Sequence, residues 1–97
     1  MGQTLLNKAE ILTPAQCRAA RALIGMNQDV LANLAGLSKL TLNKFESGKH
    51  VPGTVFLVEI RAALEVKGVV FIDQDKYGRG VRLRKRDIDL YESLRRL

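Results

Sequence analysis

The sequence contains few of the residues on which enzymes, secreted domains and metal sites depend. Its 97 residues include one cysteine, one histidine, two prolines and no tryptophan, and only 5% are aromatic. The single cysteine, Cys17, excludes an intrachain disulfide and fits a reducing compartment. One histidine, His50, without paired acids or nearby ligands, offers neither a catalytic constellation nor a metal-ligand set. We therefore expect no enzymatic activity, no cofactor and no metal.

Long apolar runs are also missing. No uninterrupted run approaches the ~18–20 residues that span a bilayer. The N-terminal stretch MGQTLLNKAEIL is broken by polar residues, unlike the apolar core of a secretory signal. We therefore predict no membrane association and a cytoplasmic, nucleoid-associated location.

What the chain does contain is apolar residues and positive charge. Apolar residues make up 46% of the sequence and the formal net charge is +6. This length and composition indicate one domain with a modest core. The charge favours a polyanionic partner, but many small domains are basic for solubility alone, so charge does not decide the function.

Residues 27–49 have the pattern of two short helices joined by a tight turn. Gln28 opens the first helix, and Gly36 ends it because glycine adopts the left-handed conformation without a Cβ penalty. Ser38 is placed to cap the second helix by accepting from its free N–H groups. The apolar face predicted for the first helix consists of Leu31, Leu34 and Ala35, with the small Ala32 where a second helix crosses.

The second helix of this pair is predicted to have one buried and one exposed side. Leu42 and Phe45 lie three residues apart and face the core, and Gly48 follows Ser47 as a stop. The residues left facing outward are Lys39, Leu40, Thr41, Asn43 and Lys44. No Asp or Glu occurs from Val30 through Phe45, which keeps repulsive carboxylates away from a phosphate backbone.

Two further helices flank this pair. Thr13 caps a helix that has Pro14 in its first position and Gln16 where a capping box requires it; it runs to about Ile24, and Gly25 stops it. A later helix spans about 54–66 and ends at Lys67-Gly68. The predicted buried stripe of the earlier helix is Cys17, Ala20, Leu23 and Ile24. The predicted apolar surface of the later helix is Val55, Val58, Ile60, Ala62, Ala63 and Leu64.

The two ends of the chain have different patterns. Residues 69–72 form an apolar run and residues 81–84 alternate, so we predict a β-hairpin whose first strand is covered on both sides and whose second is half solvated.

Residues 86–97 can form a helix that carries Ile88, Tyr91, Leu94 and Leu97. Dimerisation through this end is favoured over packing on its own domain. Residues 1–12 can form a short helix, either as an ordered arm or as a frayed tail.

The run from Thr13 to Pro52 resembles the phage repressor and Cro-like (XRE-type) helix-turn-helix family of DNA-binding regulators. The resemblance implies that Arg21 pairs with Glu46 and fixes the first helix against the recognition helix. The hairpin also resembles a segment of small bacterial repressor-like regulators. The residues that carry the main resemblance are Arg21, Gly25, Asn27, Gln28, Leu31, Ala32, Ala35, Gly36, Leu37, Ser38, Leu42, Phe45, Glu46, Ser47, Gly48 and Lys49.

The resemblance also implies how DNA would be contacted. The second helix enters the major groove with its N-terminal half against base edges. Asn27 and Gln28 would bind phosphate through side-chain amides and helix N-terminal N–H groups. The base-reading positions are occupied by Ser38, Lys39, Leu40 and Lys44. The residues that flank the groove are Thr41, Asn43, Ser47 and Lys49. Related proteins often carry Gln at these base-reading places, so Lys39 and Leu40 leave the target sequence open.

These observations predict a mainly α fold, in which a repressor-like four-helix helix-turn-helix domain precedes a C-terminal β-hairpin and a short terminal helix. The predicted units are an arm (1–12), the DNA-binding domain (13–67) and a dimerising segment (68–97). The predicted function is repression of transcription by a homodimer that binds a palindromic double-stranded DNA operator through recognition helix 38–47. The alternative is an antitoxin-type or other protein-interaction module that holds a partner protein through residues 69–97. The basic run Arg79, Arg82, Arg84, Lys85 and Arg86 fits either an extended DNA footprint or a solvated hairpin edge.

Overall fold

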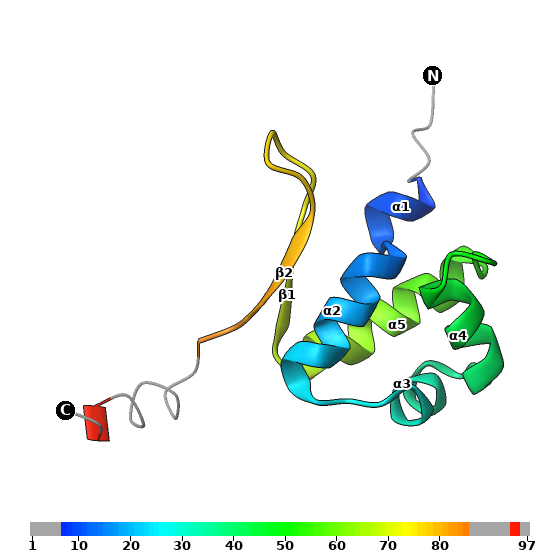
Figure 1. Cartoon of the computed structure of the whole chain (residues 1–97), viewed down its shortest axis with the longest axis horizontal. Coiled ribbons are helices and arrows are strands. Elements are labelled where there is room, and N and C mark those ends of the chain that lie inside the picture. Colours follow the sequence, from blue (N-terminus) through cyan, green and yellow to red (C-terminus); the bar gives the residue numbers. More distant parts are fainter. Residues whose placement is uncertain (1–6, 86–93, 96–97) are drawn as a thin grey trace.

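The computed structural model describes residues 7–85 and 94–95. Within these residues, helices α1 (Lys8–Ile11), α2 (Pro14–Ile24), α3 (Gln28–Ala35), α4 (Lys39–Glu46) and α5 (Thr54–Val66) precede strands β1 (Val69–Ile72) and β2 (Gly80–Leu83) (Figure 1). The predicted class, a helical domain followed by a hairpin, is confirmed. Residues 1–6 of the predicted arm lie outside the described residues. So does the predicted terminal helix, apart from residues 94–95.

The helix ends follow from local chemistry. Thr13 and Gln16 form a capping box, in which the Thr13 hydroxyl accepts from the Gln16 backbone N–H at 3.0 Å and the Gln16 side chain accepts from the Thr13 backbone N–H at 3.0 Å. Gly25 and Gly36 stop α2 and α3 with φ angles of 66° and 75°, a left-handed conformation that glycine adopts at little cost. These predicted boundaries are confirmed.

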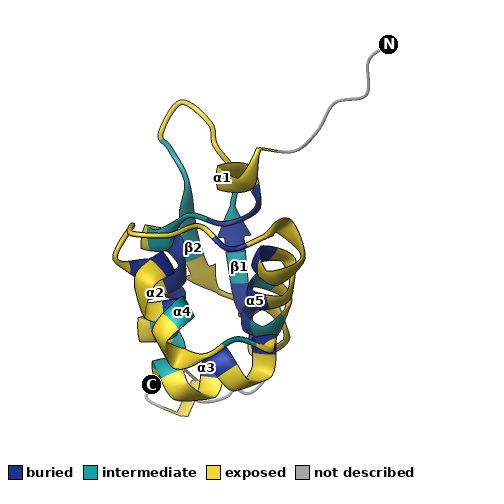
Figure 2. Cartoon of the chain, turned by 90° about the vertical axis from the view of Figure 1, so that its right-hand side faces the viewer, coloured by how far each residue is buried: buried dark blue, intermediate teal, exposed yellow. Residues whose placement is uncertain are grey.

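The core lies between α2, α3, α4 and α5, and one side of the hairpin closes it (Figure 2). The end of the N-terminal arm is part of this core, because Ile11 and Leu12 are buried. The largest fully buried side chains are Phe45, Leu12, Leu31, Leu42, Leu57, Ile60, Leu64 and Cys17. Cys17 is therefore a small core residue, as predicted.

The hairpin packs on its own domain. Its strands are antiparallel, with Val69 opposite Leu83 and Ile72 opposite Gly80. Val69 and Phe71 are buried and the alternate residues of β1 are half-buried. Within residues 7–85, helices α2 and α5 pack on the face of the sheet that carries Val69 and Phe71, so the expectation that the first strand is covered on both sides is wrong for this part of the chain.

Two side chains fasten the hairpin to the start of the chain. The Gln16 amide nitrogen donates to the carbonyl of Gly80 at 3.1 Å and to that of Ile72 at 3.5 Å. The Arg79 guanidinium donates to the carbonyl of Ala9 at 2.9 Å. Gln16 therefore both caps α2 and joins this helix to the paired ends of the two strands.

Several residues predicted to be buried are exposed. Leu23 is 40% and Leu34 48% exposed, because α2 and α3 are covered only on the sides that Cys17 and Leu31 face. On α5, burial follows Leu57, Ile60 and Leu64, and the opposite side faces outward. Val55, Val58 and Ala62, which were predicted as part of the apolar surface of this helix, are exposed and lie outside the core.

Candidate nucleic-acid interface

Side-chain caps set the start of both helices of the helix-turn-helix. The Asn27 carboxamide oxygen accepts from the backbone N–H of Val30 at 2.9 Å, and the Ser38 hydroxyl accepts from that of Thr41 at 3.1 Å. Leu37 is half-buried in the turn between them. Each cap satisfies a donor that the helix itself leaves free. Short-range contacts therefore fix the residues at which α3 and α4 begin.

One side of α4 is buried and the other is exposed. Leu42 and Phe45 are 0% and 1% exposed, and Glu46 is buried beside them. Leu40 is 63% exposed and has no part in the core. The exposed outer residues are Lys39, Leu40, Asn43 and Lys44, and Ser47 and Lys49 continue the exposed surface beyond the helix. The predicted base-reading residues are thus on one accessible surface.

The polar residues of this surface have few internal partners. The hydroxyls of Ser38 and Thr41 lie 2.9 Å apart, and that of Ser47 donates to the Lys44 carbonyl at 3.2 Å. Lys39 Nζ lies 3.6 Å from Asp29 Oδ2, and both side chains are mostly exposed. Asp29 was not considered from the sequence, since it precedes the carboxylate-free stretch by one residue. An exposed pair of this kind contributes about 0–1 kcal/mol, so it costs little for Lys39 to turn to an anion.

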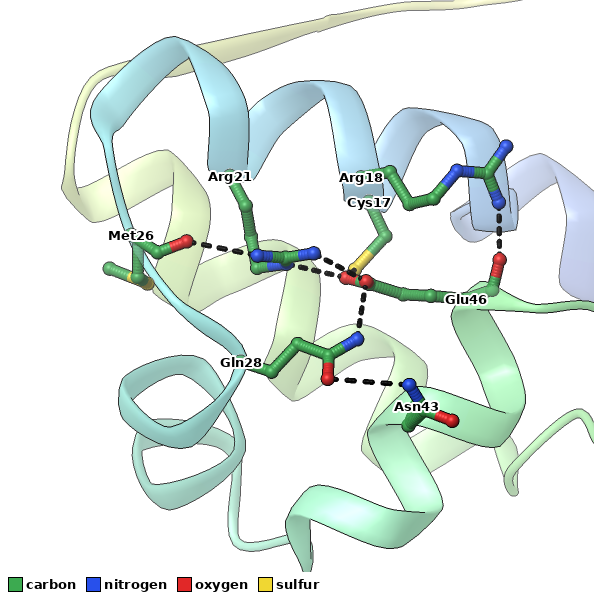
Figure 3. Close-up of polar contacts among 7 residues, drawn as sticks. All are labelled: Cys17, Arg18, Arg21, Met26, Gln28, Asn43 and Glu46. Atoms are coloured by element: carbon green, nitrogen blue, oxygen red, sulfur yellow. Dashed lines mark hydrogen bonds and ion pairs between the residues drawn. The ribbon is translucent and has the colours of Figure 1, made fainter.

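Behind this surface, Glu46 joins α4 to α2. Arg21 Nε donates to Glu46 Oε2 at 2.7 Å and Arg21 Nη2 to Oε1 at 2.6 Å (Figure 3). The Glu46 side chain is only 3% exposed. Arg21 Nη1 also donates to the Met26 carbonyl at 3.1 Å, at the entry to α3. The pairing implied by the family resemblance is confirmed, and it connects the helix that precedes the motif to both of its helices.

The other contacts of Glu46 come from Gln28 and Cys17. Gln28 Nε2 donates to Glu46 Oε1 at 2.9 Å, and the Cys17 thiol donates to Oε2 at 3.0 Å. Burial opposes ionisation of Glu46, but hydrogen bonds from Arg21, Gln28 and Cys17 outweigh it and hold the pKa of Glu46 below its ordinary value. Burial, followed by the bond to Glu46, raises the pKa of the Cys17 thiol. The hydrogen bond to Glu46 raises the pKa of Arg21. The carboxylate and the guanidinium are thus both charged at neutral pH, and the thiol is protonated.

Gln28 is shared between this network and the outer surface. Its amide nitrogen is bound to Glu46, while its amide oxygen lies 3.5 Å from Asn43 Nδ2. The bond to Glu46 uses one of the two N–H donors of the Gln28 amide, which leaves the other for a phosphate contact. The backbone N–H groups at the start of α3 are further donors. The expected phosphate contact of Gln28 stays a prediction.

Arg18 was missed by the sequence reasoning. Its Nη1 donates to the backbone carbonyl of Glu46, at the end of α4. A cation in this position complements the partial negative charge of a helix C-terminus. Its place three residues before Arg21 on the same helix was the only available signal, and it did not identify the partner.

The basic hairpin lies on the other side of the domain. In Figure 1 the strands lie to the left and α4 to the right, with α2 and α5 between them. Arg79 is engaged by Ala9, and the exposed basic residues of β2 and its end are Arg82, Arg84 and Lys85. This arrangement favours the solvated-edge interpretation over a footprint continuous with α4. Arg86 lies outside the described residues.

Two other kinds of site are absent from residues 7–85 and 94–95. No three His, Cys, Asp or Glu side chains gather there as metal ligands. Over the same residues, no helix has the length and apolar character that crossing a membrane requires.

Comparison with known proteins agrees with this geometry. A family model described as helix-turn-helix matches residues 18–71, more than half of the chain. The match begins at Arg18, contains Arg21, Gln28 and Glu46 of the buried network but not Cys17, and ends at Phe71 in β1. No curated protein matches the chain at a significant level.

Proposed function

Because the chain belongs to the XRE-type helix-turn-helix family of DNA-binding transcription regulators, we propose that it is a repressor that binds a two-fold symmetric operator as a homodimer. The observation that carries this proposal is the outer surface of α4. Lys39, Leu40, Asn43 and Lys44 are exposed there, while Glu46 anchors the same helix from behind. A helix used only for packing would not need Leu40 in water beside two lysines.

The proposed contacts divide into positioning and reading. The N–H groups that begin α3, with Asn27, Ser47 and Lys49, bind phosphates and set the register of the protein on the duplex. Lys39 and Lys44 donate to guanine O6 and N7, and Leu40 packs on a thymine methyl. Asn43 reads or flanks the same base steps. The Arg21–Glu46 pair stays inside and keeps α4 at a fixed angle to the groove.

The small size of the exposed α4 surface favours a two-fold operator and repression. One helix of eight residues reads only a few base pairs, so two copies on half-sites ~34 Å apart provide the selectivity that one copy lacks. An occupied operator excludes other proteins from the same DNA, so repression requires no surface beyond the one that binds. The action takes place on the nucleoid, in the cytoplasm.

The test is to select duplexes from a random library with the wild-type protein and to measure affinity for the enriched sequence by fluorescence anisotropy. The test variant is Lys39→Ala/Lys44→Ala. The matched control is Lys76→Ala/Lys85→Ala, which removes the same charge from the hairpin side. Each lost base contact costs about 1–3 kcal/mol, so we expect the test variant to lose at least ~30-fold in affinity and most of its sequence preference. The control should keep its preference.

Two results would count against the proposal. One is a library without enrichment even at low salt; a protein-interaction module, such as an antitoxin acting through residues 69–97, would then replace the repressor. The other is equal loss in the test and control variants, which would indicate a general attraction to phosphate without reading by α4.

A further inference from the structure

The outward side of α5 is an apolar stripe. Val55, Val58, Ala62 and Val66 follow one another at intervals of three and four residues, so they share one face of the helix. Val55 is 70%, Val58 47% and Val66 78% exposed. This face lies opposite the buried residues of the same helix, Leu57, Ile60 and Leu64. The core therefore does not use it.

Helix α3 widens this apolar surface. Val30 and Leu34 lie one turn apart and are 46% and 48% exposed, and α3 packs directly against α5. A hollow of about 340 Å³ lies between the two helices. The residues that line it are Leu34, Glu59, Ala62, Ala63, Val66 and Lys67. We call the four residues of the stripe, with Val30 and Leu34, the α3–α5 face.

A face of this kind is costly to leave in water. The largest apolar patch on a typical monomer covers roughly 300–600 Å² and is often functional. The large apolar residues of the α3–α5 face are 46–78% exposed, and Glu59 and Lys67 border the hollow within it. A standard interface uses ~800 Å² from each partner, so a stable contact between two such faces includes their polar borders.

We propose that a second copy of the chain covers the α3–α5 face, with the two α5 helices antiparallel and crossing at Ala62. This inference rests on the proposed homodimer and names its surface. At the crossing each Ala62 faces its counterpart, and the small side chain lets the helix axes come within ~8 Å. Val58 of one copy then lies beside Val66 of the other, since each is four residues from the crossing.

The charges bordering the face fit this register. Glu59 precedes Ala62 by three residues and Lys67 follows it by five. Both line the same hollow, so both lie on the same flank of α5. Antiparallel pairing about Ala62 brings Glu59 within ~3 Å, along the axis, of Lys67 of the second copy. Among the described residues, neither Glu59 nor Lys67 has an ion-pair partner within its own chain. The two-fold axis generates this pair twice.

The hairpin is a poorer surface for self-association. Its buried face is already covered by α2 and α5. Its exposed Leu83 lies between Arg82 and Arg84. An isologous contact of β2 with itself would bring these arginines and Lys85 close to their own copies, and like charges across strands are destabilising.

The test measures the dimer dissociation constant by sedimentation equilibrium, without DNA. Ala62→Glu places two carboxylates at the crossing and should weaken the dimer at least ~100-fold. Ala62 is exposed, so the variant should retain the wild-type circular dichroism and melting behaviour. The matched control is Leu83→Glu, which adds the same charge at an exposed hairpin residue and should leave the dimer unchanged.

A charge swap tests the register. Glu59→Lys and Lys67→Glu, each alone, turn two attractive contacts into two repulsive ones and should each weaken the dimer by about tenfold or more. Glu59→Lys/Lys67→Glu restores opposite charges across the interface and should recover the dimer to within ~3-fold of wild type. Residues 59 and 67 are eight apart, two turns of one helix, so recovery within a single chain is excluded.

Three results would overturn the proposal. These are a wild-type protein that stays monomeric up to ~100 μM, a dimer that Leu83→Glu breaks and Ala62→Glu does not, and a double swap that is no better than either single swap. Different results would refute the proposed function and the proposed interface. Selective DNA binding by a monomer would refute the homodimer and its α3–α5 interface but leave DNA reading by α4 intact, whereas a dimer of this register without DNA selectivity would refute the repressor and leave the interface intact.

Discussion

Replacement of Arg21 by methionine should destabilise the domain by ~3 kcal/mol, because it leaves the Glu46 carboxylate buried without its counter-ion. Methionine keeps much of the length and apolar volume of the arginine stem, so the change removes mainly the charge and the donors. The carboxylate then retains Gln28 and Cys17 as donors, neither of which carries a charge.

The magnitude follows from the contacts. Breaking a fully buried ion pair costs about 3–5 kcal/mol. The Arg21 side chain is 19% and that of Glu46 3% exposed. The remaining donors, Gln28 and Cys17, reduce the loss in free energy of unfolding, so the lower end of this range applies. A small domain has roughly 5–15 kcal/mol of stability in total. Arg21→Met should therefore remove a large share of it, and the protein should still fold at 25 °C.

The assay is urea denaturation at pH 7 followed by circular dichroism, for wild type, Arg21→Met, Glu46→Leu and the double variant. Because the double variant strands no charge, its loss should be smaller than the sum of the single losses by ~2 kcal/mol. Lys44→Met, an exposed change on α4, serves as the control and should stay within ~0.5 kcal/mol of wild type. An Arg21→Met protein as stable as the control, or additive single losses, would refute the buried-pair reasoning.

Further predictions concern the turn, the hairpin, the pH dependence and the thiol. Gly36→Ala should cost ~1–2 kcal/mol through the backbone alone, since φ is 75° and nothing lies near an added Cβ; an unchanged urea midpoint would contradict this. Gln16→Leu should remove the bond to the Gly80 carbonyl and the side-chain half of the α2 capping box and cost ~1–3 kcal/mol; hydrogen exchange should quicken in the hairpin first, and uniform quickening would argue against a local role. The depressed pKa of Glu46 adds stability that is complete above the ordinary glutamate pKa of ~4.3 and is lost as pH falls toward the folded value. The stability gap between wild type and Glu46→Gln should therefore narrow below pH ~4.3, and a gap that widens would reverse the assigned sign. Cys17 should react with a thiol reagent only as fast as the domain unfolds, because it is buried and its pKa is raised; fast reaction of the native protein would show that the site is open.

Features that depend on neighbours in the sequence were predictable. Thr13, Ser38 and Gly36 act on backbone groups within four residues, so a cap or a stop can be recognised without knowledge of the fold. The inward side of α4 was predictable for a similar reason, because Leu42 and Phe45 are its only large apolar residues apart from Leu40.

Features that depend on which elements meet were not predictable in the same way. Helix α5 has apolar residues on both sides, and its periodicity alone cannot say whether Leu57 or Val58 faces the core. The predicted apolar surface of this helix contained Val55 and Val58 and left out Leu57, because the side that faces the core depends on α2, α3 and β1. Arg18 and Cys17 reach Glu46 across 28 and 29 residues, and neither carries a local pattern that identifies its partner.

The bonds between the hairpin and residues 9 and 16 become available late during synthesis, because their partners are far apart in the sequence. Ala9 and Arg79 are 70 residues apart, and Gln16 and Gly80 are 64 apart. At a ribosomal rate of ~5–20 residues per second, these partners emerge roughly 3–14 s after one another. Arg21 and Glu46 are only 25 apart, so the link between α2 and α4 becomes available while β2 is still unmade. A nascent chain that stalls before residue 79 thus has both helices of the helix-turn-helix but lacks the Arg79 bond to α1, so α1 then depends on its contacts with α5.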